Sequence, residues 1–185
     1  MTLLDTRLSG LVLLEPRAFG DSRGEFFEAF RADKYEEFGI SGLVQDNVSY
    51  SHAGVLRGLH LQNPHAQSKL IQALHGEVWD VAVDLRAGSP TFGQWEAHVL
   101  SGTSHRQFYI PAGFAHGFVV TQGPAILAYK CTDYYHAPGE CTVRYDDPAL
   151  AIEWPSVGDL IVSDKDRQGV FLEDLPAERL LPFTP

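Results

Sequence analysis

Cysteine is scarce in this sequence, whose 185 residues contain only Cys131 and Cys141. Two cysteines are too few for a disulfide scaffold, and a chain of this length buries roughly 70% of its unfolded surface without such staples. The pattern therefore favours a reducing compartment, and we expect both cysteines to be small buried apolar side chains.

Long apolar runs are also missing. No segment approaches the ~20 residues of a membrane span. The N-terminus, MTLLDTRLSG, lacks a basic stretch followed by an apolar one. We therefore expect no membrane contact and no signal peptide, and a cytoplasmic protein.

Basic residues are few, because 14 Lys and Arg stand against 24 Asp and Glu, a formal net charge of −10. Nucleic acids and anionic membranes are bound by basic surfaces, so both are excluded as general partners. A phosphorylated small molecule remains a candidate ligand, because it needs only a few local cations.

The residues present read mainly as β-strands. The clearest strand is GEVWDVAVDLRAG at 76–88, in which apolar residues alternate with a second set that includes Asp80 and Asp84. A face with two acids and two small apolar residues fits a cavity wall and an ordinary half-exposed face equally well. The first face is formed by Trp79, Val81, Val83 and Leu85, and the second by Val78, Asp80, Ala82 and Asp84.

Turn signals at short spacing separate the other strand candidates, which favours a sandwich, barrel or jelly roll. We expect one short helix at 33–38, capped by Asp33 and ended by Gly39, and a helical turn in EDLPAERLLPFTP. No repeat or linker appears, so residues 1–185 should form a single domain. The strand candidates are 11–14, 26–30, 44–49, 70–74, 96–100, 107–110, 117–121, 125–131 and 142–145.

IPAGFAHGF, at 110–118, resembles the second motif of cupins, which are double-stranded β-helix jelly rolls. Metal-binding cupins supply H-x-H in a first motif, and this chain has no H-x-H, because Leu61 and Gln62 follow His60. The usual metal ligands are therefore missing, and we expect no metal.

GVLRGLHLQNPHAQSKL, at 54–70, contains the best candidate for a general base. The unperturbed pKa of a histidine lies nearest neutral pH, and His60 would need a carboxylate to orient it. A hairpin at the Asn63–Pro64 turn signal would bring Lys69 back near His60, where a lysine can stabilise an oxyanion.

Nine segments in order resemble the dTDP-4-dehydrorhamnose 3,5-epimerase family: GDSRGEFFE, VQDN, VLRGLHLQNPHAQSKL, GEVWDVAVDLR, GSPTFGQW, IPAGFAHGF, YKCTDYY, DDPALAIEWP and SDKD. The resemblance implies an all-β, cupin-type jelly roll with a few short peripheral helices. It implies a cofactor-independent homodimer that converts dTDP-4-dehydro-6-deoxy-D-glucose to dTDP-4-dehydro-L-rhamnose in dTDP-L-rhamnose biosynthesis.

The resemblance also implies roles for single residues. His60 would be the base, Asp166 its carboxylate partner, Tyr129 the acid, and Lys69 the group near the C4 oxygen. Part of the substrate-binding set would come from residues 1–30 of a dimer partner, namely Arg23, Phe26 and Glu28. The remaining substrate-binding positions are Gln45, Asn47, Arg57, His116, Glu140 and Lys165.

The chain departs from the family at Gln72, where many members carry an arginine. Related enzymes epimerise only C3 or only C5, or isomerise the ketone, and a non-catalytic cupin could bind a nucleotide sugar. These alternatives share most of the motifs. The other histidines are expected to be structural or exposed: His52, His65, His75, His98, His105 and His136.

The missing H-x-H motif yields a first prediction. Exhaustive chelation should leave epimerase activity unchanged, because a ketone and a histidine base need no metal for proton abstraction. The measurement is turnover before and after dialysis against a chelator. Loss of turnover that one added divalent ion restores would contradict it.

Overall fold

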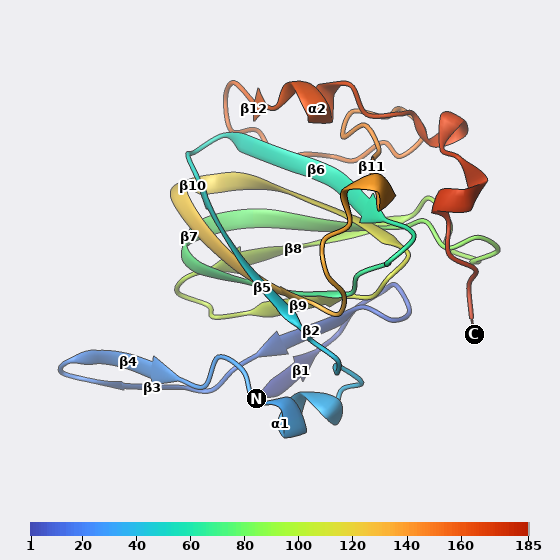
Figure 1. Cartoon of the computed structure of the whole chain (residues 1–185). Helices are drawn as coiled ribbons and strands as arrows, with labels where there is room; N and C mark the ends of the chain where they lie inside the picture. Colours follow the sequence, from blue (N-terminus) through green and yellow to red (C-terminus); the bar gives the residue numbers. More distant parts are fainter. Residues whose placement is uncertain (185) are drawn as a thin grey trace.

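Two long strands, β7 (Lys69–Asp84) and β10 (Phe114–Cys131), form the centre of the fold. A computed structural model of the chain describes residues 1–184. It pairs the two strands antiparallel, from Phe114 opposite Asp84 to Cys131 opposite Lys69. The two halves of each strand take different neighbours on their free edges, so each long strand belongs to two layers (Figure 1).

The first layer has the order β1-β2-β9-β7-β10-β5, using the start of β7 and the end of β10. In the second layer, the end of β7 pairs with β8, and the start of β10 pairs with β6. Strands β11 and β12 complete that layer on β6. The bounds are β1 Thr2–Leu4, β2 Val12–Glu15, β5 Gln45–Ser51, β6 Val55–Gln62, β8 Trp95–Ser101, β9 Gln107–Ile110, β11 Glu140–Thr142 and β12 Ile161–Val162.

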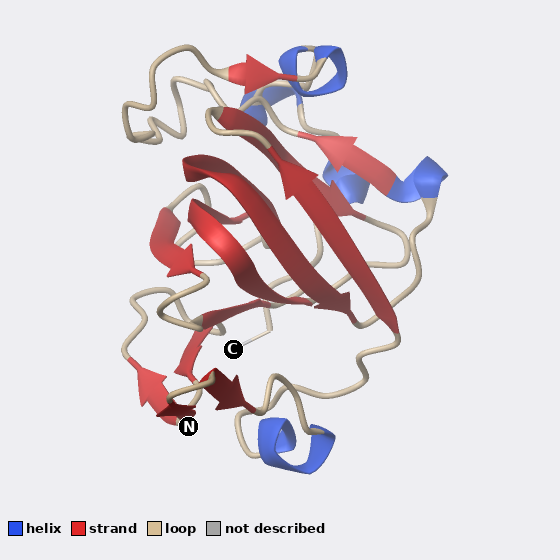
Figure 2. Cartoon of the chain, turned by 90° about the vertical axis from the view of Figure 1, so that its left-hand side faces the viewer, coloured by secondary structure: helices blue, strands red, loops and turns tan. Residues whose placement is uncertain are grey.

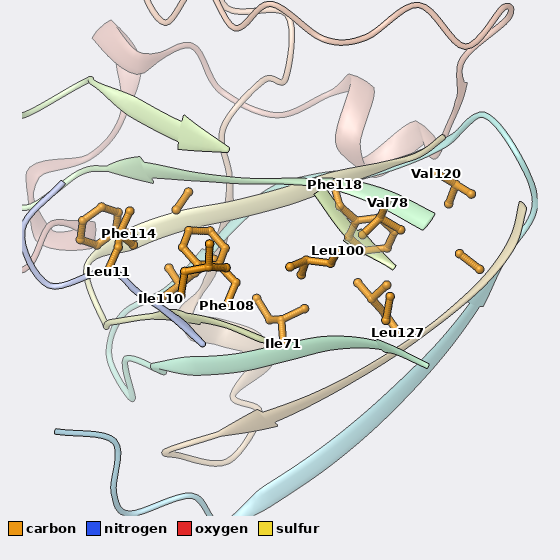
Figure 3. Packing of buried hydrophobic residues seen from close by; sticks show 14 of the residues in the cluster. Leu11, Ile71, Val78, Leu100, Phe108, Ile110, Phe114, Phe118, Val120 and Leu127 are labelled. Atoms are coloured by element: carbon orange, nitrogen blue, oxygen red, sulfur yellow. The ribbon is translucent and has the colours of Figure 1, made fainter. Parts of the chain in front are cut away.

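The two layers pack face to face, which is the jelly roll that the sequence predicted. Figure 2 shows the strands gathered at the centre of the molecule, with the short helices outside them. The main core lies between the layers, where Ile71 and Phe108 of the first layer meet Val78, Leu100 and Phe118 of the second (Figure 3).

The face of β7 that carries two acids is interior. Asp80 and Asp84 are both fully buried, so the half-exposed interpretation is wrong. The opposite face is buried as well, because Val81, Val83 and Leu85 pack under the C-terminal part of the chain. Both faces of this strand therefore exclude water, and every charge on it needs a partner.

Strands β2, β5, β8 and β9 match expected strands, whereas β7 and β10 were each expected as two strands. Gly76 and the Gly123–Pro124 pair read as turn signals, but they lie where the long strands bend between layers. Gly76 has a φ of +70°, and a Cβ there would collide with the Pro124 carbonyl. Strand β6 was not expected as a strand, and only Thr142 of the candidate at 142–145 lies in a strand, β11.

Helix α1 spans Ala32–Glu36 and begins after Arg31, so the expectation that Asp33 caps it is wrong. The Asp33 carboxylate instead accepts a 2.7 Å hydrogen bond from Arg31 Nε. Gly39 follows the helix with a φ of +75°, as expected of a stop signal. Helix α2 (Asp164–Arg167) was not expected, and the tail contains 3₁₀ turns at Leu172–Asp174 and Ala177–Arg179, as predicted. A third 3₁₀ turn spans Ala137–Gly139.

Strands β3 (Ala18–Asp21) and β4 (Gly24–Phe27) form a separate hairpin that projects from the layers (Figure 1). Seven of its eight strand residues are exposed, and only Phe27 is partly buried. The candidate at 26–30 overlaps it only in Phe26 and Phe27. Across residues 1–184, no helix is long and apolar enough to cross a membrane.

Asp84 generates a stability prediction. Burial alone would raise its pKa, but hydrogen bonds from Arg86, Ser89 and Thr91 lower the pKa to about 2. Because the folded pKa lies below the unfolded value of ~3.9, this group stabilises the fold by about 2 kcal/mol above pH 4. That contribution is lost as the pH falls from 4 toward 2.

Asp84→Asn should therefore lower the free energy of unfolding by about 3 kcal/mol at pH 7, because it leaves buried donors and a guanidinium without their partner. Urea unfolding at pH 7 and pH 3 measures this, and the difference from the unchanged chain should shrink at pH 3. Asp33→Asn, in an exposed ion pair, is the control and should change little. An unchanged midpoint for Asp84→Asn would contradict the assignment.

Candidate active site

A pocket of about 330 Å³ opens where the two layers meet. His60 reaches it from the second layer, and Lys69 and Tyr129 reach it from the first. The predicted hairpin between His60 and Lys69 is wrong, because β10 lies between β6 and β7. The loop 63–68 instead carries the chain from one layer to the other, so the two residues still line one pocket. The full lining is Gln45, Asn47, His60, Leu61, Gln62, Gln67, Lys69, Tyr129, Tyr135 and Glu140.

His60 is paired with a buried carboxylate. Its Nε2 lies 2.6 Å from Oδ1 of Asp166, which is located on α2. The second oxygen of Asp166 accepts the Gly58 N–H at 3.3 Å. An ionised Asp166 holds the proton of His60 on Nε2, so that Nδ1 carries the lone pair of a base.

The environment of Asp166 keeps it ionised. Burial alone would raise its pKa, but the hydrogen bond from His60, the positive charge of that ring when it is protonated, and the Gly58 N–H lower the pKa below the ordinary value. Ser163 caps α2 by accepting the Asp166 N–H at 3.1 Å. The cap and the Gly58 contact fix the carboxylate in the direction that His60 requires.

The glycine in R-G-L-H is required by close strand packing. Gly58 has a φ of +120°, and a Cβ there would lie 2.6 Å from the Cα of Gly117 on β10. Gly117 has no side chain either, so β6 and β10 approach closely at this point. The approach brings the Gly58 N–H within reach of Asp166 and sets His60 two residues further along β6.

Lys69 and Tyr129 present free polar groups to the pocket. Burial lowers the pKa of Lys69, while the nearby acidic groups, which include Asp80 and Glu140, oppose that shift. Burial raises the pKa of Tyr129, so its hydroxyl stays protonated. Neither Nζ of Lys69 nor the Tyr129 hydroxyl has a hydrogen-bond partner among the residues described, so both are available to a ligand.

His116 lies behind the pocket. It is opposite His60 in the pairing of β10 with β6, and directly opposed residues share a face of the sheet. Its Nε2 lies 3.0 and 2.9 Å from the two oxygens of Asp80. It is not among the residues that line the pocket, although it neighbours His60, which does.

The mouth of the pocket is held by an ionic contact between β11 and α2. Lys165 Nζ lies 2.6 Å from Glu140 Oε2, and the Tyr135 hydroxyl donates a 2.8 Å hydrogen bond to the same oxygen. Burial alone would raise the pKa of Glu140, but these two hydrogen bonds lower it. Next to the mouth, Gln45 Nε2 donates to Asn47 Oδ1 at 3.0 Å.

Arg57 is exposed on β6, where its Nε donates to Ser51 Oγ at 3.1 Å. Its charge acts on Tyr129, and it stands beside the pocket rather than in its wall. Gln62 and Gln67, which line the pocket, were missed at the sequence level. Both lie in or next to the stretch that contains His60 and Lys69, but glutamine has no acid–base signature that would single it out.

Three predicted residues lie away from the pocket of their own chain. Arg23 pairs with Asp21 and has a side chain 88% exposed, and Phe26 is 71% exposed. Glu28 pairs with Lys34 at 2.6 Å. Within residues 1–184, no group of three or more His, Cys, Asp and Glu residues is arranged to hold a metal ion.

A jelly roll that gathers a His–Asp pair, a lysine and a half-buried tyrosine around one pocket has the architecture of a cupin-type acid–base enzyme. The sequence profile described as dTDP-4-dehydrorhamnose 3,5-epimerase matches residues 5–174. The chain belongs to that family.

Named relatives agree with the profile. The dTDP-4-dehydrorhamnose 3,5-epimerase of Pseudomonas aeruginosa is 51% identical over 174 residues, covering 91% of this chain and 96% of the relative. A crystal structure from Legionella pneumophila, of dTDP-6-deoxy-D-glucose-3,5-epimerase in complex with dTDP-4-keto-L-rhamnose, superposes with a TM-score of 0.97. It is 50% identical and covers 100% of this chain and 99% of that chain.

A third solved structure has a different stated activity. ChmJ from Streptomyces bikiniensis, a 3'-monoepimerase in complex with dTDP-quinovose, superposes with a TM-score of 0.85. It is 37% identical and covers 95% of this chain and 91% of that chain. The same fold therefore serves single and double epimerisation.

Asp166 generates the prediction for this site. Asp166→Asn should lower kcat about 10³-fold or more, because the amide no longer fixes the His60 tautomer or stabilises its charged form. Far-UV circular dichroism should be unchanged. Asp164→Asn, on the same helix but exposed, is the matched control and should keep full turnover. Turnover of Asp166→Asn within tenfold of the unchanged chain would contradict the pairing.

Proposed function

We propose that this chain inverts C3 and C5 of dTDP-4-dehydro-6-deoxy-D-glucose and yields dTDP-4-dehydro-L-rhamnose, an intermediate of dTDP-L-rhamnose biosynthesis. One observation carries the proposal: His60, oriented by Asp166, shares a pocket with the half-buried Tyr129 of the opposite layer. Family membership supports the same activity.

The chemistry begins at the C4 ketone, which acidifies the protons on C3 and C5. His60 Nδ1 takes a proton, and the Asp166 carboxylate stabilises the resulting imidazolium. The electron pair moves to the C4 oxygen as an enolate, which the unpartnered Lys69 stabilises. The ketone itself supplies the acidity, so the proposal includes no cofactor.

Inversion requires a proton on the other face of the sugar. Tyr129 comes from the layer opposite His60, and burial keeps its hydroxyl protonated. It delivers a proton to the enolate carbon while His60 retains the one it removed. His60 and Tyr129 therefore have separate functions, as base and acid.

The nucleotide would be held along the mouth of the pocket. Arg57 offers a forked guanidinium to the diphosphate. Gln45, Asn47, Glu140 and Lys165 offer hydrogen bonds to sugar or base, and His116 approaches the sugar from behind His60. These contacts lie away from the reacting carbons, so their binding energy orients the ring.

The functional unit in this proposal is a homodimer of single-domain chains in which each β3–β4 hairpin reaches the site of the other chain. Exchange of the whole segment 1–30 is not part of it, because β1 and β2 pair within the sheet of their own chain. The β3–β4 hairpin supports it, because the exposed Arg23, Phe26 and Glu28 do not reach the pocket of their own chain. The outer face of the first layer supports it as well. That face exposes Val48, Tyr50 and Leu74, around an apolar depression of about 220 Å³.

Epimerisation of a single carbon is the second candidate, because the chain superposes closely on the 3'-monoepimerase ChmJ. Both candidates use the same base and differ in which carbon exchanges its proton. A cytoplasmic location is part of the proposal, supported by two cysteines that are both free.

The test is incubation with the 4-keto sugar in D₂O, followed by NMR of C3 and C5. Deuterium and inversion at both carbons are expected. His60→Ala should abolish exchange at both carbons. Tyr129→Phe should keep exchange but lose inversion, chiefly at C5, because only the delivering hydroxyl is removed.

Each contrary outcome is informative. Exchange at one carbon identifies a mono-epimerase, and exchange at neither identifies a binding protein. Near-normal exchange in folded His60→Ala would remove His60 from the mechanism. Inverted product at the normal rate in Tyr129→Phe would assign the acid to another group, with Tyr134 or Tyr135 next.

A further inference from the structure

His105 has an unusual backbone for a residue with a side chain. It lies in the turn between β8 and β9 with a φ of +56°, in the left-handed region that favours glycine. Such a conformation persists in a side-chain-bearing residue when the surroundings hold it, often for a functional reason. The contacts of the His105 imidazole indicate a structural role in holding a neighbouring segment.

The imidazole of His105 holds strand β4. Nε2 lies 2.8 Å from Oε2 of Glu25, and the ring stacks on Phe27 with centroids 4.2 Å apart and planes at 25°. The His105 side chain is only 11% exposed. The hairpin therefore contacts the layers through a buried histidine, although nearly all residues of its own two strands are exposed.

Two glutamine side chains of the first layer stabilise the same contact. The backbone carbonyl of His105 accepts a 3.2 Å hydrogen bond from Gln72 Nε2. Gln107 Nε2 donates to Gln72 Oε1 at 3.2 Å and to the Ala29 carbonyl at 2.7 Å, just after the hairpin. Gln72, where many family members carry arginine, thus links the His105 turn to the base of the hairpin.

Strand alternation gives this contact a consequence. Successive side chains of a strand point to opposite faces, so Glu25 and Phe27 face His105 while Phe26 faces away. Glu28, just after the strand, lines the same surface depression as Phe26. Phe26, Glu28 and Arg23, the last in the hairpin turn, form the presenting face, the set of side chains proposed to reach a neighbouring chain. By holding one face of β4, His105 determines where the presenting face points.

We propose that His105 is a positioning residue that fixes the direction of the β3–β4 hairpin and so delivers the presenting face to the substrate site of a second copy of this chain. The inference rests on the homodimer of the proposed function. It assigns to His105 an effect on substrate binding in the neighbouring site, without contact between His105 and substrate.

The test is His105→Gly, which removes the ring while glycine accepts the left-handed backbone. The KM for the dTDP sugar should rise about tenfold with kcat within about twofold, because base and acid remain in place and only binding is lost. The dissociation constant of dTDP alone, measured by calorimetry, should rise by a similar factor. The melting temperature should not fall.

Ala151→Gly is the matched control, because Ala151 also has a left-handed backbone, with a φ of +46°, and lies on an exposed loop. It should leave KM and dTDP affinity unchanged. Unchanged KM and dTDP affinity in His105→Gly would overturn the proposal. So would a kcat that falls as much as kcat/KM, since that would indicate damage to the catalytic groups.

Arg23→Ala separates this inference from the dimer on which it rests. If Arg23→Ala and His105→Gly both raise KM, the inference is supported. If Arg23→Ala raises KM and His105→Gly does not, the inference fails and the proposed homodimer stands. If Arg23→Ala has no effect, the presenting face does not serve a substrate site and both ideas fail.

A mixed dimer gives the sharpest result. A co-expressed dimer of one His105→Gly chain and one His60→Ala chain should contain one site with an intact base and a correctly held hairpin. That site should restore the unchanged KM, with about half the maximal rate per dimer. A mixed dimer that retains the raised KM of His105→Gly would overturn the proposal.

Discussion

The pairing of β7 with β10 is the interaction on which the rest of the structure depends. Each strand crosses from one layer to the other, so the ladder between them joins both halves of the jelly roll. The loop after β6 then has to pass from the second layer to the first. That passage places His60 and Lys69, nine residues apart, on opposite sides of one gap, and β10 adds Tyr129 at the same end.

The charged side chains around that gap differ in whether they have a partner. Asp166, Asp80 and Glu140 each have a hydrogen-bonded partner, in His60, His116 and Lys165 respectively. Lys69 has only the more distant negative charges of its neighbours, and burial disfavours its charged form. An enolate oxygen would offer Lys69 a close anionic partner, which none of the described residues supplies. In the proposed mechanism, Lys69 therefore meets its closest anionic partner only during the reaction.

The sequence predicted the jelly roll through its turn spacing and the P-x-G-x-x-H turn, and most of the residues proposed for the site only through its resemblance to one family. It did not predict helix α2, which carries Asp166. It missed the continuity of β7 and β10, because Gly76 and Pro124 give the same local signal in a bend as in a turn. It also missed the hairpin contact at His105. That contact joins Glu25 to a residue 80 positions later, and the sequence around neither residue contains a motif that would predict the contact.

The placement of base and acid on different layers has a mechanical meaning. Stacked sheets lie ~10 Å apart, a spacing set by the side chains between them. Here those side chains are Phe108, Phe118, Leu100 and their neighbours, which are packed without polar atoms (Figure 3). The core therefore sets the spacing between the two layers, and with it the width available to a sugar ring in the proposed mechanism. Its volume decides how far His60 stands from Tyr129, so the lengths of core side chains distant from the pocket matter as well as their hydrophobicity.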